Sequence, residues 1–286
     1  MHWQTARFLV DLSRPRVMGI VNLTPDSFSD GGQHATAEAG IAHCELLAEQ
    51  GADILDLGGE SSRPGAAILS EDEEWARLAP VLARAVTLGL PVSIDTCKSE
   101  IMRRALAEGA DIINDIHALE RPGALEAVAA VPKAGVCLMH MRGEPQTMLG
   151  LTDYDDVTAE VGRYLDARLQ AALQAGIHPE RIVLDPGYGF AKTSPHNLEL
   201  LRRQAELLSL GRPLLAGWSR KRTLGDLTGR PAAERVAASV TAAVLAVQRG
   251  ASLVRVHDVA ETVDALRVLA AVSENPAHSS ERQARR

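Results

Sequence analysis

The chain has 286 residues, of which 46% are hydrophobic and 23% charged, and its formal net charge at pH 7 is -7. This hydrophobic fraction is ample for a folded core, and the acidic balance argues against wholesale binding to nucleic acid or to a membrane surface. Any anionic ligand must therefore be held by a local cluster of basic side chains.

The cysteines, Cys44, Cys97 and Cys137, are widely spaced and show no metal-ligand pattern, so we interpret them as reduced thiols. The first 16 residues have no apolar core followed by a cleavage site, so we expect no secretory signal. The longest apolar run, residues 236–247, is rich in Ala and too short for a membrane span. These features predict a soluble, cytoplasmic protein.

Short apolar runs alternate with helical patterns along the chain. Ser70 stands before an acidic run, as an N-cap residue would, and several glycines follow helical patterns where a C-cap is expected. The predicted strands are 17–22, 53–57, 91–95, 111–115, 135–139, 181–185, 213–218 and 252–256, and the predicted helices are 36–50, 71–88, 99–108, 123–131, 155–175, 195–208, 232–249 and 259–272.

This alternation of strands and helices favours a single (β/α)₈ barrel, a fold that takes about 250 residues. A doubly wound open sheet is the structural alternative, although it normally has fewer strands of this regularity. We predict a barrel domain over residues 1–275, with residues 1–16 capping its bottom, and a polar tail over residues 276–286.

Polar and charged side chains recur where the predicted strands end, which is where such barrels keep their catalytic groups. A carboxylate at the mouth of an apolar barrel is costly unless something binds it. One such residue could be satisfied by a loop amide, but packing hardly explains the whole set on one face. The set comprises Asn22, Glu60, Ser61, Ser62, Arg63, Asp95, Asn114, Asp115, His140, Asp185, Ser219, Arg220, Lys221, Arg222, Arg255 and His257.

Part of this set suits a flat heterocycle. Asp95, Asn114 and Asp185 supply acceptors and one amide donor, which match an edge that presents a ring N–H beside an amino group.

Another part suits a phosphate group held together with a metal. Lys221, Arg255 and His257 are cationic donors, and Asn22 adds an amide oxygen. The run 217–222 is strongly basic within an acidic protein, as an anion site requires. By contrast, residues 187–193 lack the Gly-Lys pair and spacing of a phosphate loop, and a lone His140 is more often structural than a metal ligand.

Recognisable motifs are spread over nearly the whole chain, namely Asn22–Gly32, Gly59–Ala66, Ser93–Thr96, Ile113–Asp115, Met139–Met141, Leu184–Gly187, Gly217–Lys221 and Arg255–Asp258. Together these motifs resemble those of the dihydropteroate synthases. The resemblance implies a (β/α)₈ barrel, usually a homodimer, that joins 6-hydroxymethyl-7,8-dihydropterin diphosphate to 4-aminobenzoate in folate synthesis. It also implies release of pyrophosphate, a requirement for Mg²⁺ and inhibition by sulfonamides.

The resemblance also implies roles for single residues around the pterin. Asp185 would bind the pterin amino and N3 edge, with Asn114 beside it. Asp95 would face the ring N–H that gains positive charge, and Lys221 would donate to the pterin carbonyl and the neighbouring nitrogen. Met139 and Ser62 complete the implied pterin diphosphate site.

Further roles concern the diphosphate, the metal and the second substrate. Arg255 would stack on the pterin and, with His257, hold the diphosphate, and Asn22 would help to place Mg²⁺. Ser62 stands where the family more often has Thr, and Ala191 stands where Gly is common. The implied aminobenzoate site consists of Phe28, Ser62, Arg63, Pro64, Phe190 and Ser219.

Two alternatives remain at this stage. A pterin-dependent corrinoid methyltransferase would share Asp95, Asn114 and Asp185, but it has no use for a diphosphate clamp. A non-catalytic pterin-binding paralogue would be expected to have lost loop residues such as Phe28 or Arg63, which are present here. We also predict that the loops 23–32 and 61–65 are lids, because they are polar and poor in apolar residues.

Overall fold

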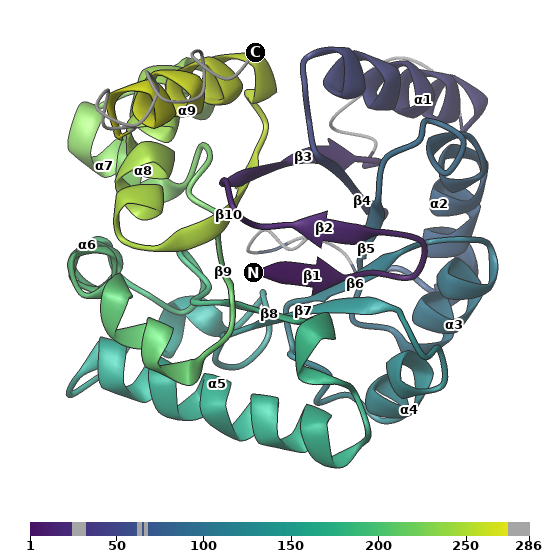
Figure 1. Ribbon diagram of the computed structural model, residues 1–286, viewed down its shortest axis with the longest axis horizontal. Helices are drawn as coiled ribbons and strands as arrows, with labels where there is room; N and C mark the ends of the chain where they lie inside the picture. Colours follow the sequence, from purple (N-terminus) through teal and green to yellow (C-terminus); the bar gives the residue numbers. More distant parts are fainter. Residues whose placement is uncertain (25–32, 62–64, 66–67, 274–286) are drawn as a thin grey trace, which may run out of the picture.

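The computed structural model describes residues 1–24, 33–61, 65 and 68–273 (Figure 1). Its centre is a closed barrel of parallel strands in the order β10-β3-β4-β5-β6-β7-β8-β9, which confirms the predicted (β/α)₈ fold. The barrel closes where β10 pairs with β3, with Val254 opposite Val17. The strands are β3 (Arg16–Asn22), β4 (Ile54–Gly58), β5 (Val92–Asp95), β6 (Ile112–Asp115), β7 (Gly135–Met139), β8 (Ile182–Asp185), β9 (Leu214–Ala216) and β10 (Ala251–Val256).

Helices surround this barrel on its outer side, as Figure 1 shows. The predicted N-cap forms a capping box, in which the Ser70 hydroxyl accepts the N–H of Glu73 and the Glu73 carboxylate accepts the N–H of Ser70. The helices are α1 (Gln33–Glu49), α2 (Glu71–Ala85), α3 (Ser99–Ala107), α4 (Ala124–Ala129), α5 (Val157–Gln174), α6 (Ser194–Arg202), α7 (Arg222–Thr228), α8 (Val236–Gln248) and α9 (Val259–Ser273).

Two helical predictions need correction. The predicted helix 195–208 is an α-helix only to Arg202, and a 3₁₀ segment, Gln204–Leu210, replaces its second half. The short α7 was not predicted, because its Thr, Gly and Asp residues give no helical periodicity. Its Gly225 lies against Arg235, where an added Cβ would come within 2.1 Å of Nη2. Tertiary contact with α8 therefore places this helix, and local sequence does not.

The interior of the barrel changes character along its axis. Successive side chains of a strand point to opposite faces, so Leu253 and Arg255 face the same side of β10, and His257 follows directly after the strand. The layer nearest the amino ends of the strands is apolar and consists of Met18, Ile54, Ile112, Cys137, Val183, Leu215 and Leu253. The next positions toward the carboxyl ends include charged residues such as Asp56 on β4.

An N-terminal hairpin covers the apolar end of the barrel. β1 (His2–Gln4) and β2 (Leu9–Asp11) pair antiparallel and lie across the ring of strands in Figure 1. Trp3 is fully buried against the apolar interior layer, and its Nε1 donates to the carbonyl of Arg181 at 2.8 Å. The short run around Trp3 gave no strand signal in the sequence.

Two further features bear on the chemistry of the chain. Cys44, Cys97 and Cys137 are buried and form no disulfide, and burial raises the pKa of Cys44 and Cys97 to about 12. In the part of the chain that the structure describes, no helix is both long and apolar enough to span a lipid bilayer.

Candidate active site

A cavity of about 540 Å³ opens at the carboxyl ends of the barrel strands. Ligand pockets in proteins commonly have volumes of about 300–1,000 Å³, so this one has room for a bicyclic substrate. The predicted residues Phe28, Ser62, Arg63 and Pro64 lie outside the described part of the chain. Asp115 does not line the cavity, because its carboxylate accepts the N–H groups of His117 and Leu119. The other residues with an implied binding role line the cavity together, namely Asn22, Asp95, Asn114, Met139, Asp185, Phe190, Ser219, Lys221, Arg255 and His257.

The floor of the cavity is an ion-pair cluster centred on Arg255. Its Nε donates to Oδ2 of Asp56 at 2.6 Å, and its Nη2 donates to Oδ2 of Asp95 at 2.7 Å. Nδ2 of Asn114 also points to Oδ2 of Asp56, at 3.3 Å. The guanidinium is therefore held in one orientation by carboxylates from two different strands.

Sequence reasoning missed Asp56. Its side chain is fully buried, and its Oδ1 makes no hydrogen bond to any described residue. The available signal was a carboxylate in the middle of an otherwise apolar strand, at the same face as Ile54 and Gly58. Such a residue is costly to bury unless a cation meets it, and that cation, Arg255, is 199 positions away in the sequence.

The carboxylates of the cavity have raised pKa values. Burial raises the pKa of Asp95 to about 7, and Asp56 adds to the rise while Arg255 opposes it. Burial also raises the pKa of Asp185, against the opposing effect of the Gly187 N–H, which donates to its Oδ1 at 2.7 Å, and of Lys221. Raised pKa values of this kind are typical of groups that bind ligands or move protons.

The loop after β8 wraps around a buried lysine. Nζ of Lys192 lies 2.9 Å from Nδ1 of His140 and donates to the carbonyls of Gly187 and Phe190 at 2.9 and 3.0 Å. The loop thereby places the Phe190 ring against Lys221, whose Nζ is 4.0 Å from the ring centroid. Residues 187–193 thus support the cavity wall, and His140 lies behind that wall and does not line the cavity.

Ser219 and His257 make a second polar contact at the rim. Oγ of Ser219 lies 2.9 Å from Nδ1 of His257 and accepts the backbone N–H of the same histidine at 3.1 Å. Burial lowers the pKa of His257 to about 3, and Arg220 and Arg255 contribute to the same shift. The imidazole is therefore neutral at ordinary pH.

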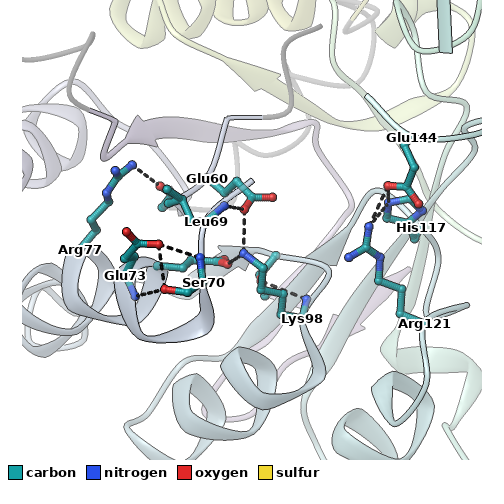
Figure 2. A network of polar contacts seen from close by, with 12 residues as sticks. Glu60, Leu69, Ser70, Glu73, Arg77, Lys98, His117, Arg121 and Glu144 are labelled. Atoms are coloured by element: carbon teal, nitrogen blue, oxygen red, sulfur yellow. Dashed lines mark hydrogen bonds and ion pairs between the residues drawn. The ribbon is translucent and has the colours of Figure 1, made fainter. Parts of the chain in front are cut away.

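Glu60, at the end of β4, has its carboxylate engaged by the protein (Figure 2). Oε2 accepts the N–H of Leu69 at 2.7 Å and the ammonium of Lys98 at 2.7 Å, and Lys98 also reaches Glu74 at 2.6 Å. At the right of Figure 2, His117 and Arg121 both contact the carboxylate of Glu144. Glu60 is therefore an anchor that ties the start of its loop to residue 69 and to the N-terminus of α3.

Comparisons of the sequence and of the structure with known proteins point to one and the same protein family. The model of the pterin binding enzyme family matches residues 18–257. The dihydropteroate synthase of Neisseria meningitidis serogroup B is 53% identical over 279 residues, which cover 96% of this chain and 98% of that protein.

Two solved structures of the dihydropteroate synthase of Xanthomonas albilineans are also similar. The one with 4-aminobenzoic acid is 54% identical with a TM-score of 0.91, and the match covers 96% of this chain and 99% of that chain. The one in complex with 7,8-dihydropteroate is 51% identical with a TM-score of 0.88, covering 96% and 100%.

Proposed function

The chain belongs to the pterin-binding enzyme family, among its dihydropteroate synthases, and from this membership we propose which of its residues carry out the reaction. It condenses 6-hydroxymethyl-7,8-dihydropterin diphosphate with 4-aminobenzoate to give 7,8-dihydropteroate and pyrophosphate in folate biosynthesis. The observation that supports the assignment of residues is the single cavity lining shared by Asp95, Asn114, Asp185 and Lys221.

The pterin ring lies on the floor of the cavity in this proposal. Asp185 accepts from the amino group and N3–H of the ring, and Asn114 bonds the neighbouring edge. Lys221 donates to the ring carbonyl from the opposite side, where it already rests on the Phe190 ring. Arg255 offers the planar face of a guanidinium that Asp56 and Asp95 hold in place.

The reaction proceeds by departure of pyrophosphate before the new bond forms. The carbon–oxygen bond to the diphosphate breaks, and the electron pair leaves with pyrophosphate. The resulting cation is spread over the dihydropterin, where the carboxylates of Asp95 and Asp185 stabilise it. The aniline nitrogen then attacks the exocyclic carbon and loses one proton. Fixed charges of this kind in a buried site contribute about 3 kcal/mol each to lowering such a barrier.

The residues of the cavity fit Mg²⁺ only as a metal shared with the diphosphate. Among the described residues, no three His, Cys, Asp or Glu side chains are grouped as a metal site. Mg²⁺ bound with phosphates needs only one or two protein ligands, because substrate oxygens and water supply the rest. Asn22, which lines the cavity, would hold the ion, and the ion would neutralise charge on the leaving pyrophosphate.

The aminobenzoate subsite is assigned to the rim of the same cavity. Phe190 and Ser219 line it on the described side, and Phe28, Ser62, Arg63 and Pro64 complete the assignment from the resemblance. Sulfonamides, which resemble aminobenzoate, would compete there. The identity to a curated synthase favours this function over the corrinoid methyltransferase and the non-catalytic paralogue.

The chain is also proposed to be a cytoplasmic homodimer. Helix α8 is apolar along its length, yet Val240, Val244 and Leu245 remain partly exposed. Leu227 on α7 and Val268 on α9 are 60% and 65% exposed, and both helices contact α8. A second copy would cover this apolar surface. Analytical ultracentrifugation should give twice the chain mass, and Val268→Asp with Leu227→Asp should shift it toward the monomer.

The assay that tests the function is pyrophosphate release with both substrates and Mg²⁺. Release should require aminobenzoate, and the product should have the mass of 7,8-dihydropteroate. Loss of the signal in Asp185→Ala, with unchanged thermal stability, would assign the activity to this cavity. Release without consumption of aminobenzoate would contradict the synthase assignment.

A further inference from the structure

Ser219 and His257 make two hydrogen-bond contacts with each other, between the proposed diphosphate and aminobenzoate subsites. The pair joins the loop after β9 to the segment after β10, and both residues line the cavity. Ser219 is 5% exposed, so its hydroxyl has few alternatives to the histidine and to a ligand in the cavity. The family resemblance assigns His257 to the diphosphate, and the proposed function assigns Ser219 to the aminobenzoate subsite.

The hydroxyl of Ser219 cannot donate its proton to His257 and to a bound ligand at the same time. A serine hydroxyl has one proton to donate and two positions at which to accept. The backbone N–H of His257 occupies one accepting position at 3.1 Å. While the hydroxyl proton is donated to Nδ1, 2.9 Å away, the proton of the neutral imidazole must be on Nε2. Nε2–H is then the donor left for an anion.

The charges around His257 keep it neutral in the free protein. Besides burial, Arg220 and Lys221 from the β9 loop and Arg255 from β10 disfavour a second proton. Asp258 favours it, but Asp258 is paired with Arg220 at 2.5 Å. A diphosphate in the cavity would add negative charge beside the ring and reverse this balance.

We propose that the Ser219–His257 pair is a hydrogen-bond switch that couples occupancy of the diphosphate subsite to binding of the aminobenzoate carboxylate. When the anion is bound, His257 takes one proton from water and carries N–H on both ring nitrogens. Nδ1–H then donates to Oγ of Ser219, whose own proton turns toward the cavity and is donated to the carboxylate. One proton is taken up, and no other bond in the protein forms or breaks.

This proposal rests on the proposed function and is tested by titrating 4-aminobenzoate into the protein with and without Mg²⁺–pyrophosphate. Pyrophosphate should raise the affinity of the wild-type chain for aminobenzoate roughly tenfold, as expected for one added hydrogen bond to a charged group. Ser219→Ala should lose this gain, so that pyrophosphate no longer raises the affinity of the chain for aminobenzoate. A residue that merely touches aminobenzoate would lower both affinities equally.

Two variants separate the switch from loss of structure. Ser219→Thr keeps the hydroxyl and should keep the gain. Ser239→Ala is the matched control, because Ser239 also accepts a backbone N–H of this loop, that of Arg220 at 2.9 Å. It should lower stability and keep the gain. Loss of the gain in Ser239→Ala would show that loop stability, and not the hydroxyl of Ser219, governs the coupling.

Proton uptake gives an independent reading. The enthalpy of Mg²⁺–pyrophosphate binding, measured in two buffers of different ionisation enthalpy, should reveal uptake of up to about one proton. His257→Asn should abolish both the uptake and the coupling, whereas Ser219→Ala should abolish the coupling alone. An absence of uptake or of coupling in a wild-type chain that still releases pyrophosphate would overturn the switch and leave the function standing. A wild-type chain inactive with both substrates would instead contradict the function.

Discussion

The two ends of the barrel carry similar side chains but use them differently. At the amino ends of the strands, Asp111 accepts hydrogen bonds from the backbone N–H, Nε and Nη2 of Arg7 and from the N–H of Val92. At the carboxyl ends, Asp56 has one oxygen shared by Arg255 and Asn114, and its other oxygen makes no hydrogen bond within the described chain. Asp111 therefore stabilises the fold, whereas Asp56 orients Arg255, a residue that lines the cavity.

Among substitutions that test this difference between the two ends, we expect the largest effect, a loss of pterin affinity, at Asp185. Asp185→Ala would leave the N–H groups of a bound pterin buried without an acceptor, so affinity should fall by roughly a hundredfold or more. Calorimetry with a simple pterin measures the loss, and thermal denaturation checks that the fold is retained. Tight binding to this variant would remove Asp185 from the pterin site.

At the opposite end, Asp111→Ala should affect stability and not chemistry. It leaves the partly exposed Arg7 and the buried N–H of Val92 without their acceptor, and such a loss costs about 2 kcal/mol. Urea denaturation should show the loss, while kcat per folded molecule stays at the wild-type value. A fall in kcat alone would mean that the two ends are not independent.

His257 should discriminate between phosphorylated and simple pterins. His257→Ala removes a donor at the diphosphate subsite, and affinity for the diphosphate substrate should fall roughly tenfold, while that for a simple pterin stays constant. Arg255 is a poorer probe, because its removal also leaves Asp56 and Asp95 without their cation. If His257→Ala lowered the affinity for both ligands equally, His257 would not be recognising the phosphate groups.

The smallest effect is a shift in pH dependence. Because burial raises the pKa of Asp95 in the free protein to about 7 and its ionised form is the one that stabilises the cation, kcat/KM should rise with pH through about 7. Asp56 raises that pKa, so Asp56→Asn should move this limb to lower pH, by roughly a unit or less. A limb that moves to higher pH would contradict the assignment of the limb to Asp95.

The barrel could be predicted from the sequence because each strand and helix leaves a pattern within its own segment of the chain. Each barrel strand is a short apolar run, and the strand ends supply the polar residues that the structure gathers around one cavity. What the sequence could not predict depends on distant contacts. Trp3 forms part of a strand because it packs on the barrel interior. The role of Asp56 follows only from its ion pair with Arg255. Pattern within one segment carries no information on either contact.

The three buried thiols have a practical consequence for experiments on this chain. Maleimide dyes react with exposed thiolates, and burial keeps Cys44, Cys97 and Cys137 both covered and protonated. A single cysteine introduced at an exposed position such as Leu9 should therefore take up a fluorophore against a silent background. Such a variant could then serve for single-molecule fluorescence without replacement of any native cysteine.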